Sequence, residues 1–455
     1  MLKPLSLSEL QTVLNATLVG ADASFQRVST DSRNIASGEL FIALKGPNFD
    51  GNRYLAEVAA KGAVAALVSQ ADATVELPQL VVADTRIALG LLGAYNRQRF
   101  TGLVAAVTGS SGKTTVKEML ASILAVKGAV LATRGNLNND LGAPLTLLEI
   151  GSEHQAAVIE LGASAVGEIA YTVALTRPDV AIITNAGSAH VGAFGGPEKI
   201  VEAKGEILEG LSASGTAVLN KDDAAYETWV RRASGRRILS FSKNHSSADF
   251  FAQDITLSEQ GCPRFTLHSP EGSVAIVLNL IGEHNVLNAL AAAAAASALG
   301  MSLSEIAQGL KALAPIKGRS VIKTLRGHRQ VIDDSYNANP QSIKAAIDSL
   351  AHFTGRKVLV LGDMGELGAW SEAGHREVGE YAKGRVDAFY AVGEQMRFAA
   401  AAYGPSAQHF ITQAALATAL ADEQDPQTTF LIKGSRSAAM DKIVEVLCAA
   451  DGEKG

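Results

Sequence analysis

Cysteine is scarce in this chain of 455 residues, which holds only Cys262 and Cys448, far apart and near no cluster of histidines. This pattern argues against a disulfide framework and is typical of two reduced thiols in a cytoplasmic protein. Runs of lysine and arginine are missing as well, and the formal net charge is −6. We therefore expect no nucleic-acid partner, because no basic surface for a phosphate backbone is evident.

Long hydrophobic runs are also absent. The first 20 residues contain no basic stretch followed by an apolar core, so a signal peptide is not expected. The longest apolar stretch, residues 289–299, is rich in alanine and too short to cross a bilayer, which predicts a buried helix instead. These features predict a protein without membrane insertion, located in the cytoplasm.

What the chain does contain is the composition of a large globular protein, with 47 % apolar and 19 % charged residues. Its length exceeds one ordinary hydrophobic core, so several domains are expected. Apolar runs alternate with helical patterns through most of the sequence, which predicts an α/β fold with largely parallel sheets. The pattern predicts three domains, at residues 1–84, 85–314 and 315–455.

The first and last of these domains differ in their patterns. The first contains strand-like runs at 40–44 and 64–68, separated by a glycine-rich loop. The last alternates strands and helices, which predicts a small, Rossmann-like, doubly wound domain. Its expected strands are 329–334, 357–361, 387–392 and 428–432, and its expected helices are 340–353, 372–384 and 437–449. Asn339 before Pro340 is a strong helix-start signal.

The strongest local motif is a glycine turn at residues 108–115, between a predicted strand at 103–108 and an amphipathic helix. In such a turn, backbone N–H groups and the helix N-terminus surround phosphate oxygens. Lys113 is expected to bridge the β- and γ-phosphates of a nucleotide, and the Thr114 hydroxyl to bind Mg²⁺. The motif predicts a central ATPase domain of the P-loop type, built on a parallel sheet.

The spacing of this motif is shorter than that of the common P-loop, because Val107 stands where the first glycine would be. The alternative is a glycine and serine turn that happens to contain a lysine. The strand before the turn and the helix after it favour the phosphate loop.

Two further residues follow predicted strands at the same edge of the sheet. Glu160 ends the strand at 156–161, and His190 lies in the loop after the strand at 180–185. In an open parallel sheet, loops at the carboxyl ends of the strands converge on the ligand. A carboxylate suits Mg²⁺, whereas a histidine is more typical of Zn²⁺ or Mn²⁺, so a loop-capping role for His190 stays open.

Lys204 lies in a predicted helix at 196–211, on the same face as Ile200 and Leu208, whereas Glu206 is expected to lie away from that face. A buried lysine loses its proton more easily, because desolvation disfavours the charged form. A neutral amine can react with CO₂ and become a carbamate, which would add a carboxylate near Mg²⁺. The alternative is a lysine that extends from the edge of the apolar face to solvent.

The order of these motifs resembles that of the Mur ligase family. The matching stretches are 108–115, 160–162, 185–190, 203–206, 282–285, 318–319 and 333–340. Further stretches at 135–139, 144–148, 361–368 and 433–437 resemble the branch of the family that adds D-alanyl-D-alanine. The resemblance runs from about residue 27 to about residue 440, and its specificity comes from the ordered combination.

The resemblance implies ATP and two Mg²⁺ ions as cofactors. Thr114 and Glu160 would bind one ion, and His190 with a carbamylated Lys204 the second. The residues implied around ATP are Gly109, Ser110, Ser111, Gly112, Lys113, Thr114, Thr115, Asn285, Asn288, Arg319, Asp334, Tyr336 and Asn339. Among these, the two asparagines of 285–288, Tyr336 and Asn339 match the adenine side, Asp334 the ribose, and Arg319 the γ-phosphate. The implied catalytic residues are Lys113, His190, Lys204 and Arg319.

The resemblance also implies substrate contacts in each domain. Thr30, Asp31, Ser32, Arg33, Asp50 and Gly51 match the site for the UDP-sugar. Asn136, Asn138 and Asn139 match contacts to the muramoyl peptide, and Ser435 with Arg436 matches the segment that closes over the peptide substrates. Without the family order, each of these would be an ordinary turn or loop residue. Members often have histidine where Asn52 stands, so no role is assigned there.

The resemblance implies an ATP-dependent amide ligase that acts through an acyl phosphate. Its expected substrates are UDP-N-acetylmuramoyl-tripeptide and D-alanyl-D-alanine, and we expect a monomer whose third domain closes over the second near residues 314–318. One alternative is another ligase of the superfamily, such as folylpolyglutamate synthase, which would lack the first-domain motifs. A second is a nucleotide-sensing protein without catalysis, against which the intact Lys113, Glu160, His190 and Lys204 argue.

Overall fold

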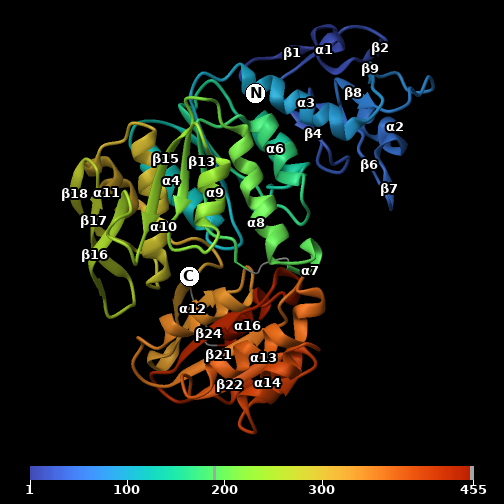
Figure 1. The fold of residues 1–455 in the computed structure, drawn as a ribbon. Helices are drawn as coiled ribbons and strands as arrows, with labels where there is room; N and C mark the ends of the chain where they lie inside the picture. Colours follow the sequence, from blue (N-terminus) through green and yellow to red (C-terminus); the bar gives the residue numbers. More distant parts are fainter. Residues whose placement is uncertain (188–190, 451–455) are drawn as a thin grey trace.

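The computed structural model describes residues 1–187 and 191–450, and it contains three large sheets in succession along the chain (Figure 1). The blue N-terminal domain lies at one end of the molecule, the green and yellow central domain in the middle, and the orange and red C-terminal domain at the other end. The predicted α/β class is confirmed. The predicted boundaries at 84/85 and 314/315 stay a prediction.

The N-terminal domain has a five-stranded sheet in the order β2-β9-β8-β5-β4, parallel except for β2. Its strands are β2 (Thr17–Val19), β4 (Val28–Ser29), β5 (Leu40–Ile42), β8 (Ala65–Val68) and β9 (Gln79–Val81). Two short pairs accompany it, β1 (Leu5–Ser6) with β3 (Ser24–Phe25) and β6 (Lys45–Gly46) with β7 (Phe49–Asp50). Its helices are α1 (Leu7–Leu14) and α2 (Leu55–Ala60), with the 3-10 turn η1 (Gly51–Tyr54), and α3 (Thr85–Gln98) follows and leads to the central domain.

The central domain is built on a nine-stranded sheet in the order β11-β12-β10-β13-β14-β15-β16-β17-β18. It is parallel from β11 to β16, and β17 and β18 follow as antiparallel hairpins. The strands are β10 (Leu103–Thr108), β11 (Val130–Ala132), β12 (Ala156–Glu160), β13 (Val180–Ile183), β14 (Thr216–Asn220), β15 (Arg237–Ser242), β16 (Phe250–Leu257), β17 (Pro263–Ser269) and β18 (Gly272–Val277). The predictions for β10, β12 and β13 are confirmed, whereas the hairpins were not predicted because their alternating polar face carries a weaker signal.

Helices cover both faces of this sheet, as parallel strands require. They are α4 (Lys113–Leu124), α5 (Gly142–Leu148), α6 (Glu168–Thr176), α7 (Val191–Phe194), α8 (Pro197–Gly205), η2 (Glu206–Gly210), α9 (Tyr226–Arg232), α10 (His284–Ala298) and α11 (Leu303–Ala312). None of the helices in residues 1–187 and 191–450 is long and apolar enough to cross a membrane. The alanine-rich stretch is the buried helix α10, as predicted.

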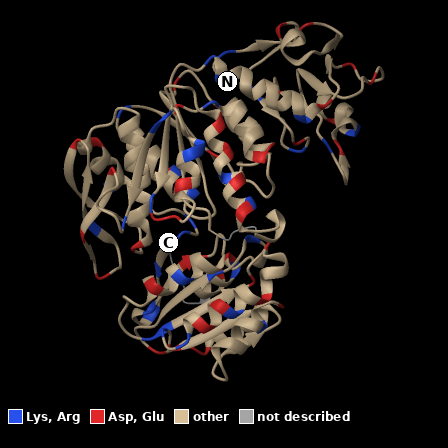
Figure 2. Ribbon diagram, viewed as in Figure 1, with Lys and Arg blue, Asp and Glu red and all other residues tan. Residues whose placement is uncertain are grey.

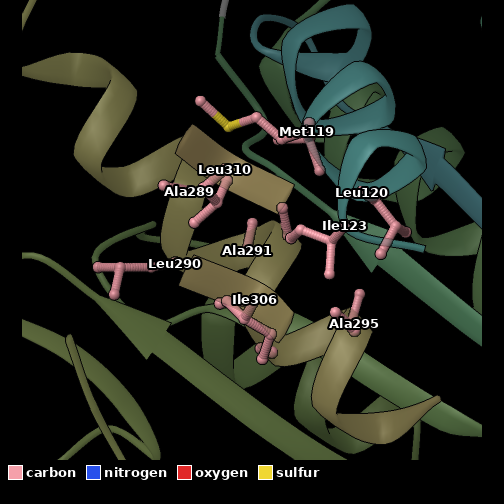
Figure 3. Close-up of a cluster of buried hydrophobic side chains, with 14 of the residues drawn as sticks. Met119, Leu120, Ile123, Ala289, Leu290, Ala291, Ala295, Ile306 and Leu310 are labelled. Atoms are coloured by element: carbon pink, nitrogen blue, oxygen red, sulfur yellow. The ribbon is translucent and has the colours of Figure 1, made fainter. Parts of the chain in front are cut away.

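The core of the central domain fixes the helix that follows the phosphate loop. Met119, Leu120 and Ile123 of α4 point toward α10 and α11 (Figure 3) and are fully buried. The alanines of α10 let the helix axes approach closely, and a side chain at Gly309 of α11 would clash with the backbone of Ile123. Burial of each large side chain here contributes about 1.5–3 kcal/mol, so α4 is firmly anchored.

The C-terminal domain has a six-stranded sheet in the order β19-β20-β24-β21-β22-β23, parallel except for β19. The strands are β19 (Val321–Thr324), β20 (Gln330–Asp334), β21 (Lys357–Gly362), β22 (Ala388–Val392), β23 (Gln408–Phe410) and β24 (Thr429–Lys433). The helices are α12 (Pro340–Leu350), α13 (Ser371–Ala382), α14 (Met396–Tyr403), α15 (Gln413–Ala421) and α16 (Asp441–Ala450), with the 3-10 turns η3 (Arg326–His328), η4 (Gly368–Trp370) and η5 (Arg436–Ala438). The four predicted strands are confirmed, and β19 and β23 were missed.

The central and C-terminal domains share a hydrophobic contact. Val191 and Phe194 of α7 and Ile200 of α8 belong to the same buried cluster as Met364 and Leu367 of the C-terminal domain. Figure 1 shows α7 at this junction, next to the orange and red domain. This apolar junction sets how closely the two domains approach. By contrast, acidic and basic residues are interspersed over all three domains (Figure 2).

Candidate active site

The phosphate loop, residues 109–112, joins β10 to α4 and is braced by residues at the end of β13. Ser111 donates from N and Oγ to Asn185 Oδ1 at 3.1 and 3.2 Å, and Asn185 Nδ2 donates to Ser111 O at 3.1 Å. Thr184 Oγ1 donates to the same carbonyl at 2.6 Å. Gly112 has φ +79°, where a side chain would be strained and would meet Asn288 Oδ1 at 2.5 Å. The loop is therefore preorganised in a curled conformation that suits a phosphate.

Two cationic side chains lie at this loop. Lys113 Nζ donates to Gly109 O at 2.7 Å, and burial lowers the pKa of its ammonium, an effect that Glu160 opposes. Arg319, which follows α11, donates to Thr114 Oγ1 at 3.2 Å, and its guanidinium carbon lies 4.3 Å from the centre of the Tyr336 ring. An ammonium and a planar guanidinium together can neutralise a terminal phosphate group.

Glu160 ends β12 and is buried beside the loop. Its Oε2 accepts a hydrogen bond from Thr114 Oγ1 at 3.0 Å, and its Oε1 accepts one from Asn138 Nδ2 at 2.8 Å. A carboxylate and a hydroxyl are oxygen donors of the kind that Mg²⁺ prefers, and Mg²⁺ usually takes its other ligands from phosphates and water. This pair therefore fits a Mg²⁺ site, and it is tied directly to the loop that carries the three predicted asparagines.

Lys204 is only 1 % exposed on α8, and its Nζ lies 5.3 Å from the centre of the Phe194 ring. Burial, and to a smaller extent the nearby charge of Lys113, lowers the pKa of Lys204 to about 7, while Glu168 and Glu206 act in the opposite direction. The predicted burial of Lys204 is confirmed, and the amine can be neutral near neutral pH.

The expectation that Glu206 lies away from the buried face was wrong. Its side chain is 3 % exposed and accepts hydrogen bonds from the N–H groups of Gly167 at 2.6 Å and Ala170 at 2.9 Å. The chain changes from α8 to the tighter turn η2 at this residue, which rotates Glu206 inward. The carboxylate thereby caps the N-terminus of α6. His190, the other predicted ligand, lies outside the described residues.

A cleft of about 1150 Å³ opens between the central and C-terminal domains. It brings together predicted site residues that are far apart in the sequence. Those that line it are Ser110, Ser111, Gly112, Lys113, Thr114, Asn136, Asn138, Asn139, Glu160, Arg319, Tyr336, Asn339, Ser435 and Arg436. One space is thus lined by the phosphate loop, by Thr114 and Glu160, by the loop of Asn136, Asn138 and Asn139 (the asparagine loop), and by the Ser435 segment.

Several predicted nucleotide contacts, among them Asn339 of the cleft, already form hydrogen bonds or ion pairs within the protein. Asn285 donates from Nδ2 to Ile281 O at 2.8 Å and accepts from Asn288 at 2.9 Å. Asp334 forms a buried ion pair with Lys433 at 2.6 Å, and Asn339 caps α12 through a bond from Ser342 N at 2.9 Å. The side chains of these residues therefore have partners within the protein. Gly109 and Thr115 belong to the loop and to the start of α4 without lining the cleft.

The predicted UDP-sugar residues lie in the N-terminal domain and do not line this cleft among the described residues. Asp31 and Arg33 form a bidentate pair with two 2.8 Å bonds, while Thr30 and Ser32 belong to the same loop. Asp50 accepts from Asn52 N at 3.0 Å at the start of η1. Gly51 has no room for a side chain, which would meet Ala43 Cα at 2.8 Å. The two segments lie at the ends of β4 and β7 in the N-terminal domain.

Several residues at the cleft were missed by the sequence analysis. They are Lys117, Glu118, Ser164, Glu168, Lys317, Glu366 and Asp441. Lys117 could have been noticed, because it lies one turn after Lys113 and next to the apolar face of the same helix. Glu366 lies inside the family-like stretch 361–368 but was given no role, and the others carry no pattern that separates them from solvated polar residues.

The fold and the cleft define a three-domain α/β protein in which a phosphate-loop motif opens into a cleft between the central and C-terminal domains. Family profiles match it along the chain: the "Mur ligase family, catalytic domain" at residues 24–95, the "Mur ligase middle domain" at 107–296, and the "Mur ligase, glutamate ligase domain" at 318–436. The chain belongs to the Mur ligase family.

Individual relatives agree over almost the full length. The UDP-N-acetylmuramoyl-tripeptide–D-alanyl-D-alanine ligase of Escherichia coli K12 is 46 % identical, covering 97 % of this chain and 98 % of the relative. The ligase of the same name from Haemophilus influenzae is 40 % identical, covering 97 % of both chains. A crystal structure of MurF from Acinetobacter baumannii has a TM-score of 0.93 at 42 % identity, covering 98 % and 99 %. MurF from Thermotoga maritima in complex with ADP has a TM-score of 0.83 at 28 % identity, covering 93 % and 97 %.

Proposed function

We infer that this protein is an ATP-dependent ligase that joins D-alanyl-D-alanine to UDP-N-acetylmuramoyl-tripeptide in the synthesis of a peptidoglycan precursor. The observation that carries this inference is the single cleft in which the phosphate loop, the Glu160–Thr114 pair and the asparagine loop face the Ser435–Arg436 segment. A triphosphate and an acyl acceptor could meet there. The two relatives named for this reaction match 97 % of the chain, including the first domain, whose motifs at 30–33 and 49–51 a folate ligase would lack.

The reaction proceeds through an acyl phosphate. A carboxylate oxygen of the tripeptide attacks the γ-phosphorus of ATP, and the bond to the β-phosphate oxygen breaks to release ADP. Lys113 and Arg319 spread the charge of the transferring group, and the N–H groups of the loop orient it. The amine of D-alanyl-D-alanine then attacks the acyl carbon and loses a proton, and phosphate leaves. No covalent enzyme nucleophile is required.

The acyl phosphate must be kept from water, which would hydrolyse it. The cleft lies between two domains that meet through the apolar contact of α7 with Met364 and Leu367. We propose that docking of these surfaces closes the cleft around the intermediate, with a hinge near residues 314–318. Asn136, Asn138 and Asn139 would orient the muramoyl peptide, and Arg436 the incoming dipeptide.

Mg²⁺ fits the site at Thr114 and Glu160, whose oxygen atoms are already adjacent. We propose a second ion at His190 and a carbamate on Lys204, supported by the burial of Lys204 and its pKa of about 7. When bound, such ions would neutralise charge on the phosphate oxygens. We further propose that the first domain holds the UDP-sugar through the loop at 30–33 and the turn at Asp50, and that the protein acts in the cytoplasm as a monomer.

The test is phosphate release from ATP, measured with each substrate alone and with both together. The proposal requires release to depend on UDP-N-acetylmuramoyl-tripeptide and the ligated product to depend on D-alanyl-D-alanine as well. Release with a folate and glutamate instead would identify the other ligase of the superfamily. Binding of ATP with no turnover under any combination would identify a nucleotide-sensing protein.

A further inference from the structure

A buried lysine lies behind the candidate Mg²⁺ site. Lys117 is one turn after Lys113 on α4 and is 1 % exposed, and it lies between the apolar core residues Val116 and Met119, with Glu118 directly after it. Its Nζ donates to Thr133 O at 2.5 Å and lies 2.8 Å from Glu118 Oε1. Burying an ammonium costs several kcal/mol before its partners compensate, and packing alone would be served as well by an apolar side chain. The buried ammonium of Lys117 therefore indicates a role other than packing.

Thr133, the partner of Lys117, stands where the β11–β12 ladder ends and the asparagine loop begins. Its N–H still follows the ladder, donating to Val158 O at 3.1 Å. Its hydroxyl, however, accepts the N–H of Glu160 at 2.9 Å, and its carbonyl accepts Lys117. Two side chains thus replace the backbone bonds at the point where the strand stops.

This junction supports both halves of the site. The backbone N–H of Glu160 donates to the Thr133 hydroxyl. Its carboxylate accepts one hydrogen bond from Thr114 at 3.0 Å and another from Asn138 at 2.8 Å. Asn138 O in turn accepts the N–H of Gly162 at 2.8 Å. A shift of Thr133 would therefore move the Glu160 carboxylate and the asparagine loop together.

We propose that Lys117 and Thr133 form a strut that positions the Glu160 carboxylate for Mg²⁺ and, through Asn138, sets the asparagine loop for the muramoyl peptide. Lys117 is a positioning residue in this scheme, because it acts on the backbone of Thr133. The assignment of the loop to the peptide rests on the proposed function, whereas the effect on the metal site does not. Groups that orient metal ligands typically change metal affinity by about 10–100-fold when they are removed.

The test compares Lys117→Met with the wild type in two measurements. The first titrates Mn²⁺ into the protein with ADP and follows free Mn²⁺ by electron paramagnetic resonance, which requires no turnover. We expect Mn²⁺ affinity to fall about 10-fold or more while ADP affinity without metal changes by less than about 2-fold, because the phosphate loop is untouched. The second is steady-state ligation, in which the KM for the muramoyl tripeptide should rise about 5-fold or more with little change in the KM for ATP at saturating Mg²⁺.

Three further variants separate a strut from general destabilisation. Thr133→Val removes the hydroxyl that accepts the Glu160 N–H, so it should lower Mn²⁺ affinity and raise the tripeptide KM as Lys117→Met does. Thr133→Ser keeps the hydroxyl and should give wild-type values in both measurements. Lys127→Met removes another lysine that donates to a carbonyl, Gly300 O at 2.8 Å on the surface, and should change neither measurement. The double variant, Lys117→Met with Thr133→Val, should lose less Mn²⁺ binding free energy than the sum of the losses of the two single variants, because both act on one junction.

Loss of Lys117 or of the Thr133 hydroxyl is expected to change Mn²⁺ affinity by about 10-fold or more. The proposal is overturned if Lys117→Met and Thr133→Val lower the melting temperature but leave Mn²⁺ affinity and the tripeptide KM within about 2-fold of wild type. If Lys117→Met does not fold, the Val and Ser variants of Thr133 decide the question by the same criteria. If the wild type binds Mn²⁺ with ADP but ligates no D-alanyl-D-alanine, the proposed function fails while the effect of the strut on the metal site stands.

Discussion

Replacing Gly192 with alanine should hold the central and C-terminal domains apart. Gly192 lies on α7, and its N–H donates to Glu366 O of the C-terminal domain at 3.3 Å. An added Cβ would lie 2.5 Å from Gly368 N and 2.6 Å from Leu367 C. Non-bonded atoms of this kind settle at about 3.5 Å, so one backbone must retreat by about 1 Å. No side-chain rotation can relieve the contact, because both partners are main-chain atoms.

Such a retreat reaches the reacting groups through Arg319. This residue comes from the segment that leads into the C-terminal domain and bonds to Thr114 Oγ1 of the central domain at 3.2 Å. Displacement by about 1 Å takes the pair beyond hydrogen-bond distance, and misplacement of this size typically costs about 10²-fold in rate. We expect kcat for ligation to fall by about that factor. ATP affinity should change little, because the phosphate loop belongs entirely to the central domain.

Phosphate release and product formation measure this effect, together with a thermal melt to show that the variant is folded. Gly195→Ala is the matched control in the same segment. Gly195 has φ +80° and no atom within 4 Å of an added Cβ, so its substitution costs about 1 kcal/mol of backbone strain without pushing on the other domain. The reasoning is refuted if Gly192→Ala folds normally and turns over at the wild-type rate, or if Gly195→Ala loses as much activity.

Three further results are expected at the phosphate loop and at Lys204. Lys113→Ala should lower kcat by about 10³-fold in the phosphate-release assay, because no other group occupies its place beside Gly109, and wild-type turnover would contradict this. Arg319→Lys keeps the charge but loses the planar fork and the contact with Tyr336, so kcat should fall about 10-fold or more; an unchanged rate would show that charge alone suffices. For Lys204, the pKa of about 7 means that the amine is protonated below that pH and available to CO₂ above it. Bicarbonate should therefore reactivate CO₂-depleted enzyme at pH 8 but not at pH 6, and equal recovery at both values would exclude the carbamate.

The sequence by itself determined much of the site at the level of local motifs. The glycine turn between β10 and α4, the apolar face of α4 and the Asn339 cap of α12 depend on neighbouring residues and on helical and strand periodicity. These signals are short in range, so they survive in a linear reading. The burial of Lys204 was also predictable, because its helix has a clear apolar face.

Only the tertiary structure decided which of these motifs meet and which polar groups are already engaged. Asp334 is paired with Lys433, 99 residues away in sequence, and Lys117 with the carbonyl of Thr133, and no periodicity encodes either contact. Glu206 turned inward because α8 tightens into η2, a change of a fraction of a turn that a regular helix pattern cannot anticipate. Hydrogen bonds and ion pairs between distant segments depend on the packing of whole sheets and helices, so they exist only once the chain has folded.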